Sequence, residues 1–598
     1  MRSNSLPKDD GHKTKNARVT TNKHPTGAAM LRESPKKILF LVPVHISYES
    51  YVSPPRNART IVKKGRILNS LATDLPLGLL SISAYLKKFL DLDVRLADFN
   101  TEVSALDSFD YPNFAEFAKQ YLTEHFSTDF TPDIIGISSL FSPSYQNFIE
   151  LGATVKAIWP KALLVGGGNI PTNSYHHIFQ TGGFRFFDAL CFGEGEKPML
   201  DLLKAESPEN HLASATSWIT AEKLAGGFIP KHDFIVDLDE IPFYDYALCD
   251  HGRHSLNPVM TSYAAHSDSM GYHIMTSRGC PFHCTFCASH QVHGRKMRYH
   301  STDRVFADIR RLVEQYSAKT LIFQDDHFMA DKERVLSILK FIEQEKLNAI
   351  FQNGLTLYSL DYETLSAFKR AGVNQLVLPL ESGSEKVLKY QMKKPLKMSI
   401  SRQVTEDCRK LGIYTDANIL IGLPGETRQD IEDARRNLRT IPANWYHVVC
   451  ASPVVGSEIH KIASEKGYIS GNVLGADYRT AVINTPDFSA EYIQDMQYVF
   501  NLELNFLYNS DLRLGELALA EAGFSNVLGL RPDHLMANLC LSYVQMKKGN
   551  EAEAAKHLAR CHDPLLASGW EKYLGIMDLH IPSSITDVVG IIENKWLQ

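Results

Sequence analysis

The sequence predicts an α/β protein that continues into a helical C-terminal region. Short apolar stretches alternate with amphipathic helical stretches twice, over residues 36–204 and again over 270–470, and this alternation is typical of parallel sheets. Beyond about residue 489 the strand pattern disappears and only helical patterns remain. We therefore expect a doubly wound sheet, a partial (β/α)6 barrel and a helical end.

Composition excludes several classes of protein. With 598 residues, 44% of them apolar, 36 Gly and 27 Pro, the chain is neither collagen-like nor wholly disordered. Its 63 Lys and Arg against 68 Asp and Glu give a net charge of −5, which points to neither nucleic acid nor a membrane surface as a partner. Nine cysteines, an odd number in a long chain, argue against a disulfide framework and favour a reducing, cytoplasmic setting.

The ends of the chain carry less information. Residues 1–35 are polar and basic, with no apolar run before Ile38, so we expect a disordered tail without a secretory signal or a membrane span. Residues 471–598 are predicted to form a helical domain. Within it, residues 518–558 resemble about one and a half tetratricopeptide units. This region is a candidate surface for a protein partner, and an ordinary helical cap is the alternative.

The first α/β series, residues 36–204, is predicted to be Rossmann-like. Ile38–Val42 is a continuous apolar run of the kind found in buried parallel strands. Asp74–Gly78 opens a helix that reaches Lys88, and residues 144–158 form a second helical stretch. The other predicted strands are Val94–Ala97, Ile134–Ser138, Leu163–Val165 and Ala189–Phe192. Residues 205–269 are predicted to be a linker.

The second series, residues 270–470, fits a partial barrel whose site is built by loops at the carboxyl ends of its strands. Its predicted strands are His273–Thr276, Thr320–Gln324, Ala349–Asn353, Gln375–Leu380, Tyr414–Leu420 and Tyr446–Ala451. The helical stretches between them include Asp303–Tyr316, Lys332–Glu345 and Asp361–Ala371.

Three cysteines lie within eight residues, directly after the first strand of this series. Cys280, Cys284 and Cys287 have the spacing Cys-x3-Cys-x2-Cys, and thiolates are the ligands of iron–sulfur clusters. Three ligands on a four-iron cluster leave one iron open to another molecule. The main alternative is zinc with a fourth ligand from His283, His290 or His293. A buried cysteine trio without a ligand is the third interpretation.

Together with Phe286, these cysteines resemble the signature of the radical S-adenosylmethionine superfamily, Cys-x3-Cys-x-aromatic-Cys. The resemblance implies a [4Fe-4S] cluster held by the three thiolates. It also implies that S-adenosylmethionine binds the open iron and is cleaved to methionine and a 5′-deoxyadenosyl radical. An external electron donor such as flavodoxin or ferredoxin is implied as a partner.

Later strands carry segments that resemble the family's S-adenosylmethionine contacts. Residues 324–326 stand where polar groups hold the methionyl amine, although they depart from the common Gly-Gly-Glu. Leu380–Gly383 resembles the segment beside the ribose and methionyl groups, and Ile421–Glu426 resembles the segment beside adenine. Helix caps and turn glycines are the structural alternatives. The implied contacts are Phe286, Asp325, Asp326, Glu381, Ser382, Gly422 and Pro424.

Small residues follow several strands of the first series, where they let the backbone approach a large ligand. This arrangement resembles the cobalamin-binding domain of radical enzymes that pair cobalamin with S-adenosylmethionine. The implied contacts are Pro76, Leu77, Gly78, Ser138, Ser139, Gly166, Gly167, Gly168, Glu194 and Gly195. A nicotinamide site is disfavoured, because no Gly-x-Gly-x-x-Gly follows the first strand. No Asp-x-His-x-x-Gly occurs in 36–204, which implies cobalamin without a histidine ligand.

The combined resemblance implies a class B radical methyltransferase-like enzyme. It would methylate an unactivated carbon of a small molecule or natural-product intermediate through methylcobalamin and the 5′-deoxyadenosyl radical. One alternative is oxidative cyclisation or ring rearrangement with the same cofactors. The other is a non-catalytic cobalamin-binding scaffold. No residue is predicted to act as a general acid or base.

Overall fold

The computed structural model describes residues 35–597, except for positions 55–57, 59, 127–128, 255–270, 352, 395, 472, 475–478 and 564–568. The tail predicted over 1–35 lies outside the described residues apart from its last position, and so does the end of the linker predicted over 205–269. Residues Lys36–Gln598 form one compact unit. In the described part of this chain, every helix is too short or too polar to cross a membrane.

The first sheet has six strands in the order β4-β1-β5-β6-β7-β8. The first five are parallel, as predicted. Residues 38–41 of β1 are almost completely buried, because both faces of the sheet are covered, and this explains the continuous apolar run. The strands are β1 (Lys36–Val42), β4 (Leu92–Asp98), β5 (Ile134–Ser138), β6 (Leu163–Gly167), β7 (Ala189–Cys191) and β8 (Trp218–Ile219).

Strand β8 corrects the predicted linker. It pairs antiparallel with β7, and the Trp218 side chain is fully buried, so the first sheet ends later than residue 204. A strand of two residues has no period of its own and exists only because a partner strand is present. The predicted linker also contains α8 (Pro208–Ser214) and α9 (Ala221–Ala225).

Helices surround the first sheet. The two predicted helices are confirmed as α2 (Leu77–Phe89) and α5 (Tyr145–Ile158). A hairpin of β2 (Thr60–Lys63) and β3 (Arg66–Asn69) precedes α2, in a stretch where the sequence predicted no strand. The remaining helices are α1 (Tyr48–Val52), α3 (Phe99–Ala105), α4 (Phe114–His125), α6 (Asn169–Gln180) and α7 (Glu196–Lys204).

The second series contains the six predicted strands, divided between two parallel sheets. Their orders are β9-β12-β13 and β14-β15-β16, and β13 lies next to β14. Along β14 the side chains alternate between fully buried and half-buried, so one face packs under helices and the other faces a less filled interior. The strands are β9 (Gly271–Ile274), β12 (Thr320–Phe323), β13 (Asn348–Phe351), β14 (Gln375–Glu381), β15 (Tyr414–Ile421) and β16 (Trp445–Cys450).

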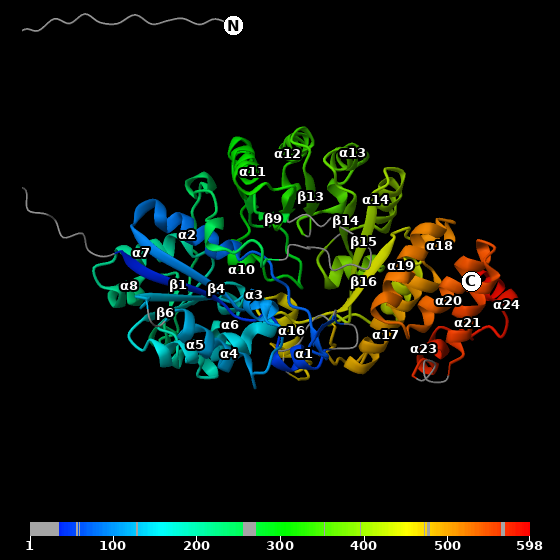
Figure 1. Cartoon of the computed structure of the whole chain (residues 1–598), viewed down its shortest axis with the longest axis horizontal. Coiled ribbons are helices and arrows are strands. Elements are labelled where there is room, and N and C mark those ends of the chain that lie inside the picture. The colour runs from blue at the N-terminus through cyan, green and yellow to red at the C-terminus, as the bar shows by residue number, and fades with distance from the viewer. Residues whose placement is uncertain are drawn as a thin grey trace, which may run out of the picture. The chain divides into compact units, whose positions relative to one another are not determined.

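Five helices connect these strands, and Figure 1 shows α11 to α14 side by side along one face of them. The predicted helices begin one residue after Ser301, Asp331 and Asp361, whose side chains accept hydrogen bonds from backbone amides of the first turn. The helices are α11 (Thr302–Tyr316), α12 (Lys332–Gln344), α13 (Tyr362–Arg370), α14 (Met398–Lys410) and α15 (Arg428–Leu438).

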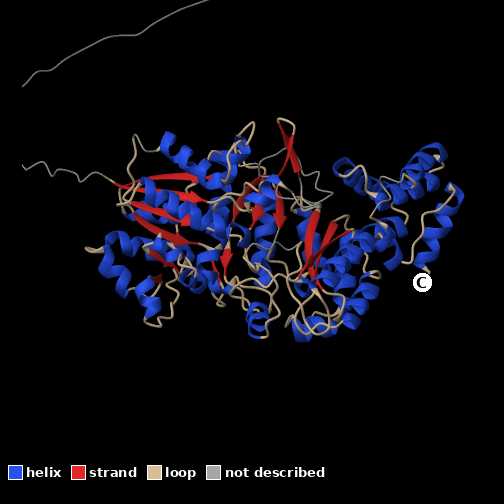
Figure 2. Cartoon of the chain, turned by 90° about the horizontal axis from the view of Figure 1, so that it is seen from below, coloured by secondary structure: helices blue, strands red, loops and turns tan. Residues whose placement is uncertain are grey.

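The C-terminal region is helical, as predicted, and Figure 2 shows the chain around its C-terminus built from helices. It is joined to β16 through a shared core that includes Trp445 and Phe506. Glu503 is buried and bridges Arg435 and Arg439 at 2.6 and 2.9 Å. The helical segments are α17 (Ala490–Leu502), η8 (Glu503–Leu507), α18 (Ser510–Arg513), α19 (Leu517–Leu530), α20 (Leu535–Lys547), α21 (Glu551–Cys561), α23 (Glu571–Ile576) and α24 (Ile585–Trp596).

Candidate functional site

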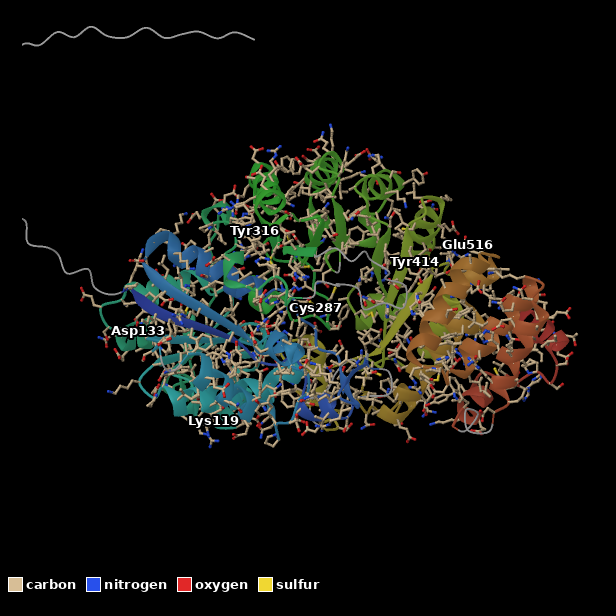
Figure 3. All side chains as sticks on the ribbon, viewed as in Figure 1. Lys119, Asp133, Cys287, Tyr316, Tyr414 and Glu516 are labelled. Carbon is tan, nitrogen blue, oxygen red and sulfur yellow. The ribbon has the colours of Figure 1, made fainter. Side chains whose placement is uncertain are left out.

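The three predicted cluster ligands lie on one loop, the cysteine loop, between β10 (Ser277–Arg278) and α10 (His290–His293). Figure 3 labels Cys287 on this loop. β10 pairs with β11 (Arg298–Tyr299), which closes the loop at its base. Gly279 has a φ of +93°, and a side chain there would come 2.5 Å from the carbonyl oxygen of Lys296. Only glycine therefore suits the point where the chain turns into the loop.

Thr285 anchors the middle of the cysteine loop. Its amide donates to the carbonyl of Met392 over 3.1 Å, and its hydroxyl donates to the carbonyl of Gln391 over 2.6 Å. Its own carbonyl accepts from the amide of Ile459 over 3.0 Å. The loop is thus held by the segments that follow β14 and β16, and none of these bonds uses a thiol.

The three thiols fit an iron–sulfur cluster chemically. They form no disulfide bond, and they are half-buried. Burial raises the pKa of both Cys280 and Cys284 to about 11, so these thiols are protonated at neutral pH in the absence of a metal. A coordinating metal deprotonates a thiol, so a bound cluster would convert them into thiolate ligands. Phe286, the aromatic residue of the motif, packs against the core of the second series.

The zinc alternative needs four ligands around one ion. Among the described residues, no group of three or more His, Cys, Asp or Glu side chains is close enough to hold a single metal ion. His293 instead contacts Glu194 at 2.9 Å. A cluster does not require such a gathering, because its cysteines bind different iron atoms.

Asp325 and Asp326 differ in their surroundings. Asp325 is buried, and its carboxylate accepts from the hydroxyls of Thr276 and Ser277 over 2.8 and 2.6 Å, which ties the end of β12 to the strand before the cysteine loop. The buried Oδ2 of Asp326 has no hydrogen-bond partner. Asp326 is close enough to Cys280 for its charge to add to the burial that raises the pKa of that thiol. An unpartnered carboxylate oxygen suits a cationic amine, so Asp326 fits S-adenosylmethionine better than Asp325.

Glu381 holds a strained backbone at the carboxyl end of β14. Its φ is +65°, which is uncommon outside glycine, and the pairing with β15 shifts register before it. Such strain costs about 1–3 kcal/mol and is concentrated at functional sites. The carboxylate of Glu381 accepts from Lys394 over 2.9 Å. The neighbouring Ser382 is fully buried, and its hydroxyl accepts from the amide of Ser384.

The turn after β15 is built around a buried carboxyl group. Gly422 has a φ of +89°, and a side chain there would meet Ile493 at 2.7 Å. The carboxylate of Glu426 accepts from the amides of Gly422 and Leu423 over 2.7 and 3.0 Å. Burial nevertheless raises the pKa of Glu426 to about 7. Pro424 lies half-buried within this turn. The arrangement fixes the segment predicted to lie beside adenine.

Several residues predicted to contact cobalamin meet at the carboxyl edge of the first sheet. Gly168 has a φ of +93°, and a side chain there would lie 2.7 Å from the carbonyl oxygen of Ser139 and 3.0 Å from the hydroxyl of Ser138. The loops after β5 and β6 therefore touch. Gly78, at the start of α2, has open space where a side chain would be, and the preceding Pro76 and Leu77 are half-buried.

Other glycines at this edge serve the packing of the domain itself. A side chain on Gly166 would meet Phe148 at 2.7 Å, and one on Gly195 would meet Ile82 of α2 at the same distance. These two glycines let a helix lie close to the sheet or to another helix. Gly167 has no atom closer than 3.9 Å to the position of a side chain.

Glu194, predicted to contact cobalamin, is the centre of a buried ion network. Its carboxylate lies 3.1 Å from Arg278, 2.5 Å from Arg298 and 2.9 Å from His293. Glu196 pairs with Arg278 at 2.7 Å. Although burial by itself raises the pKa of Glu194, the neighbouring Arg278, His293 and Arg298 hold it far below its usual value. The carboxyl edge of the first sheet is thereby fastened to the cysteine loop on both sides of the cysteines.

The sequence-based prediction missed the cationic members of this network. Arg278 lies two residues before the first cysteine, and Arg298 lies on the strand that closes the loop. Both guanidinium groups are buried. The signal that could have found Arg278 is its place between an apolar strand and the glycine that precedes the first cysteine, where a buried charged side chain needs a partner.

Two family models match the chain, and each matches the part that carries one set of predicted residues. The model of the radical SAM superfamily matches residues 274–438, which include the cysteine loop and the predicted S-adenosylmethionine contacts. The model of the B12 binding domain matches residues 67–203, which include the predicted cobalamin contacts.

Known proteins resemble the chain over most of its length. An uncharacterised methyltransferase of Pyrococcus horikoshii is 26% identical over 391 residues, covering 65% of this chain and 79% of the relative. Cytidylyl-2-hydroxyethylphosphonate methyltransferase of Streptomyces wedmorensis is 24% identical, covering 72% and 86%. The cobalamin-dependent S-adenosylmethionine radical enzyme OxsB, solved with aqua-cobalamin and S-adenosylmethionine, shares the fold with a TM-score of 0.55 and 14% identity over 94% of this chain and 84% of that one.

Proposed function

Because the chain belongs to the radical SAM superfamily and carries a B12-binding domain, we propose that it is a cobalamin-dependent methyltransferase acting on an unactivated carbon of a small molecule. The relatives named as methyltransferases support this choice of reaction. Its cofactors are a [4Fe-4S] cluster, S-adenosylmethionine and cobalamin.

The observation that carries the proposal is the ion network of Glu194. It joins the end of β7, in the B12-binding domain, to Arg278 and Arg298 on either side of the cysteine loop. Methyl transfer to a substrate radical requires both cofactors to face one substrate in a space that excludes water. A fixed junction at the cysteine loop meets that requirement, whereas a scaffold that only stores cobalamin has no need of it.

We assign the following roles to the chain's own residues. When bound, the cluster and S-adenosylmethionine supply hydrogen abstraction from the substrate, and cobalamin supplies the methyl group. Cys280, Cys284 and Cys287 would hold the cluster. The unpartnered oxygen of Asp326 would accept from the methionyl amine. The open space beside Gly78 would let the corrin ring approach the start of α2.

Finer features of the chain belong to the same proposal. The two three-stranded sheets would be the halves of one partial barrel over residues 270–470. The B12-binding domain would extend from residue 36 through β8, and residues 471–598 would form a tetratricopeptide-like domain that binds a protein partner. An external flavodoxin or ferredoxin would reduce the cluster, and the enzyme would work in the cytoplasm.

The proposal is tested with anaerobically reconstituted protein. We expect about four irons per chain, one cobalamin, reductant-dependent 5′-deoxyadenosine and transfer of labelled methyl from S-adenosylmethionine to the cobalamin. Cys284→Ala should lose iron and 5′-deoxyadenosine, whereas Cys408→Ala, at a buried position of α14, should keep both. With substrate present, label should reach the product. Deoxyadenosine with an unlabelled product would indicate oxidative cyclisation or rearrangement, and absence of deoxyadenosine would reject the enzyme.

A further inference from the structure

A carboxylate and three imidazoles lie together where the B12-binding domain meets the first strand of the radical SAM domain. Asp74 stands two residues before Pro76, and its Oδ1 lies 3.3 Å from Nε2 of His273 on β9. His45, three residues beyond the end of β1, and His254 are near enough for their charges to act on Asp74.

His273 faces the interior of the radical SAM domain. Its neighbours Tyr272 and Ile274 belong to the core under the helices, and Tyr272 packs against Tyr316 of α11. Because side chains alternate along a strand, His273 points to the opposite face. The contact with Asp74 therefore crosses from the segment predicted to face cobalamin to the inner face of β9.

Two of the three imidazoles are buried with ring nitrogens that lack a hydrogen-bond partner, whereas Nδ1 of His254 lies 3.1 Å from the carbonyl oxygen of Thr73. His273 is 1% exposed, and neither of its ring nitrogens makes an aligned hydrogen bond; His45 is 8% exposed, and its Nδ1 has no partner. The backbone holds His45 firmly, since its amide donates to Asn100 and its neighbouring carbonyls accept from Asn147. Buried polar atoms are nearly always satisfied in folded proteins, so these ring nitrogens are available to hydrogen-bond a ligand.

The carboxylate of Asp74 lacks a permanent counter-charge among the described residues. Among the described residues, the only basic group within ion-pair distance of Asp74 is His273. Burial opposes ionisation of Asp74, but His273, His45 and His254 hold its pKa below the usual value. Burial lowers the pKa of His45 to about 4 and also lowers that of His254. At neutral pH, an ionised Asp74 carboxylate thus stands near the neutral imidazole of His45.

We propose that Asp74, His45 and His273 form a subsite that binds a protonated amino group of the substrate. An alkylammonium ion has three donors and no acceptor, which complements one carboxylate and two imidazoles. A hydroxyl would supply a single donor and no charge. A metal ion does not fit, because the described residues hold no group gathered closely enough for one. The assignment rests on the proposed function, which places the substrate between cobalamin and the inner face of the radical SAM domain.

The test uses n-butylammonium and n-butanol, which have the same shape and differ in charge and donors. Binding to the reconstituted holoenzyme is measured by calorimetry at physiological ionic strength. We expect millimolar affinity for n-butylammonium and at least tenfold weaker binding of n-butanol. Asp74→Asn should weaken n-butylammonium binding at least tenfold, and Asp74→Glu should recover part of it. Asp91→Asn, at an exposed aspartate between α2 and β4, is the matched control and should bind as the wild type does.

Two results overturn the proposal. One is equal binding of the two probes, or unchanged affinity in Asp74→Asn. The other is loss of cobalamin from Asp74→Asn, measured by its absorbance, because the cluster would then serve the cofactor. Failure of the proposed function is distinguishable. Absence of label transfer from S-adenosylmethionine to cobalamin in the wild type would reject the methyltransferase, whereas charge-selective binding at Asp74 would still stand.

Discussion

Replacing Glu194 by Gln should loosen the cysteine loop from the first sheet. The carboxylate is 4% exposed and contacts Arg278, His293 and Arg298, so the substitution leaves two buried guanidinium groups with Glu196 as their remaining counter-charge. Removal of one member of a buried ion pair costs about 3–5 kcal/mol. Glutamine keeps the size and one acceptor, so we expect about 3 kcal/mol, or roughly 100-fold in the equilibrium for local opening.

The assay is amide hydrogen exchange of residues 278–298 in the Glu194→Gln variant, with iron content as a second readout. Exposed Glu206→Gln is the control and should exchange like the wild type. The ion network holds the pKa of Glu194 below its unfolded value of about 4.3. The stabilisation is therefore present above that pH and is lost only as the pH falls toward the depressed pKa, so the variant should differ from the wild type by a constant amount between about pH 5 and 8. Exchange within twofold of the wild type would refute this account.

Three further variants test other parts of the structure. Gly168→Ala should destabilise the first domain by about 1–3 kcal/mol and lower its cobalamin content, because φ is positive and the new methyl group meets a carbonyl oxygen. The control Gly590→Ala in α24 has free space for its methyl group and should be neutral or stabilising in a thermal melt. The folded-state pKa of Glu426 is raised to about 7, so the free energy of unfolding should fall as pH rises from about 4.3 to about 7. Glu426→Gln should flatten this pH dependence. An equally steep profile in the variant would contradict the raised pKa. Glu503→Gln should lower the denaturant midpoint of the C-terminal helices by leaving Arg435 without its buried partner, and an unchanged midpoint would show that the pair adds no stability.

Strand positions were predictable where burial itself leaves a local pattern. Ile134–Ser138 was predicted with the bounds that the structure has, and Val94–Ala97 lies inside β4. Strand β8 and the β2–β3 hairpin were missed for different reasons. The first has two residues, and the second exposes its apolar side chains Val62 and Ile67. Neither element produces a periodic apolar pattern in the sequence. Each is defined by pairing with another strand and not by the burial of one face.

The division of the second series into two sheets was also beyond the sequence. Each of its six strands has its own apolar pattern. Whether the neighbouring strands β13 and β14 pair depends on their distance and angle within the core that both sheets share, and in the described residues they belong to separate sheets. The same limit applies to the end of the first domain. A linker and a short edge strand have similar composition, and only the partner strand distinguishes them.

By itself the sequence determined the cysteine loop, the succession of strands along the chain and the small residues that follow them, because spacing and periodicity are properties of neighbouring residues. Only the tertiary structure decided what the charged residues do. In the structure, Glu194 contacts Arg278 and Arg298. Asp325 hydrogen-bonds to the strand before the cysteines, and Asp74 contacts His273. These partners lie tens to hundreds of positions apart, and a buried charge acts on whatever the packing of the sheets brings within a few ångströms.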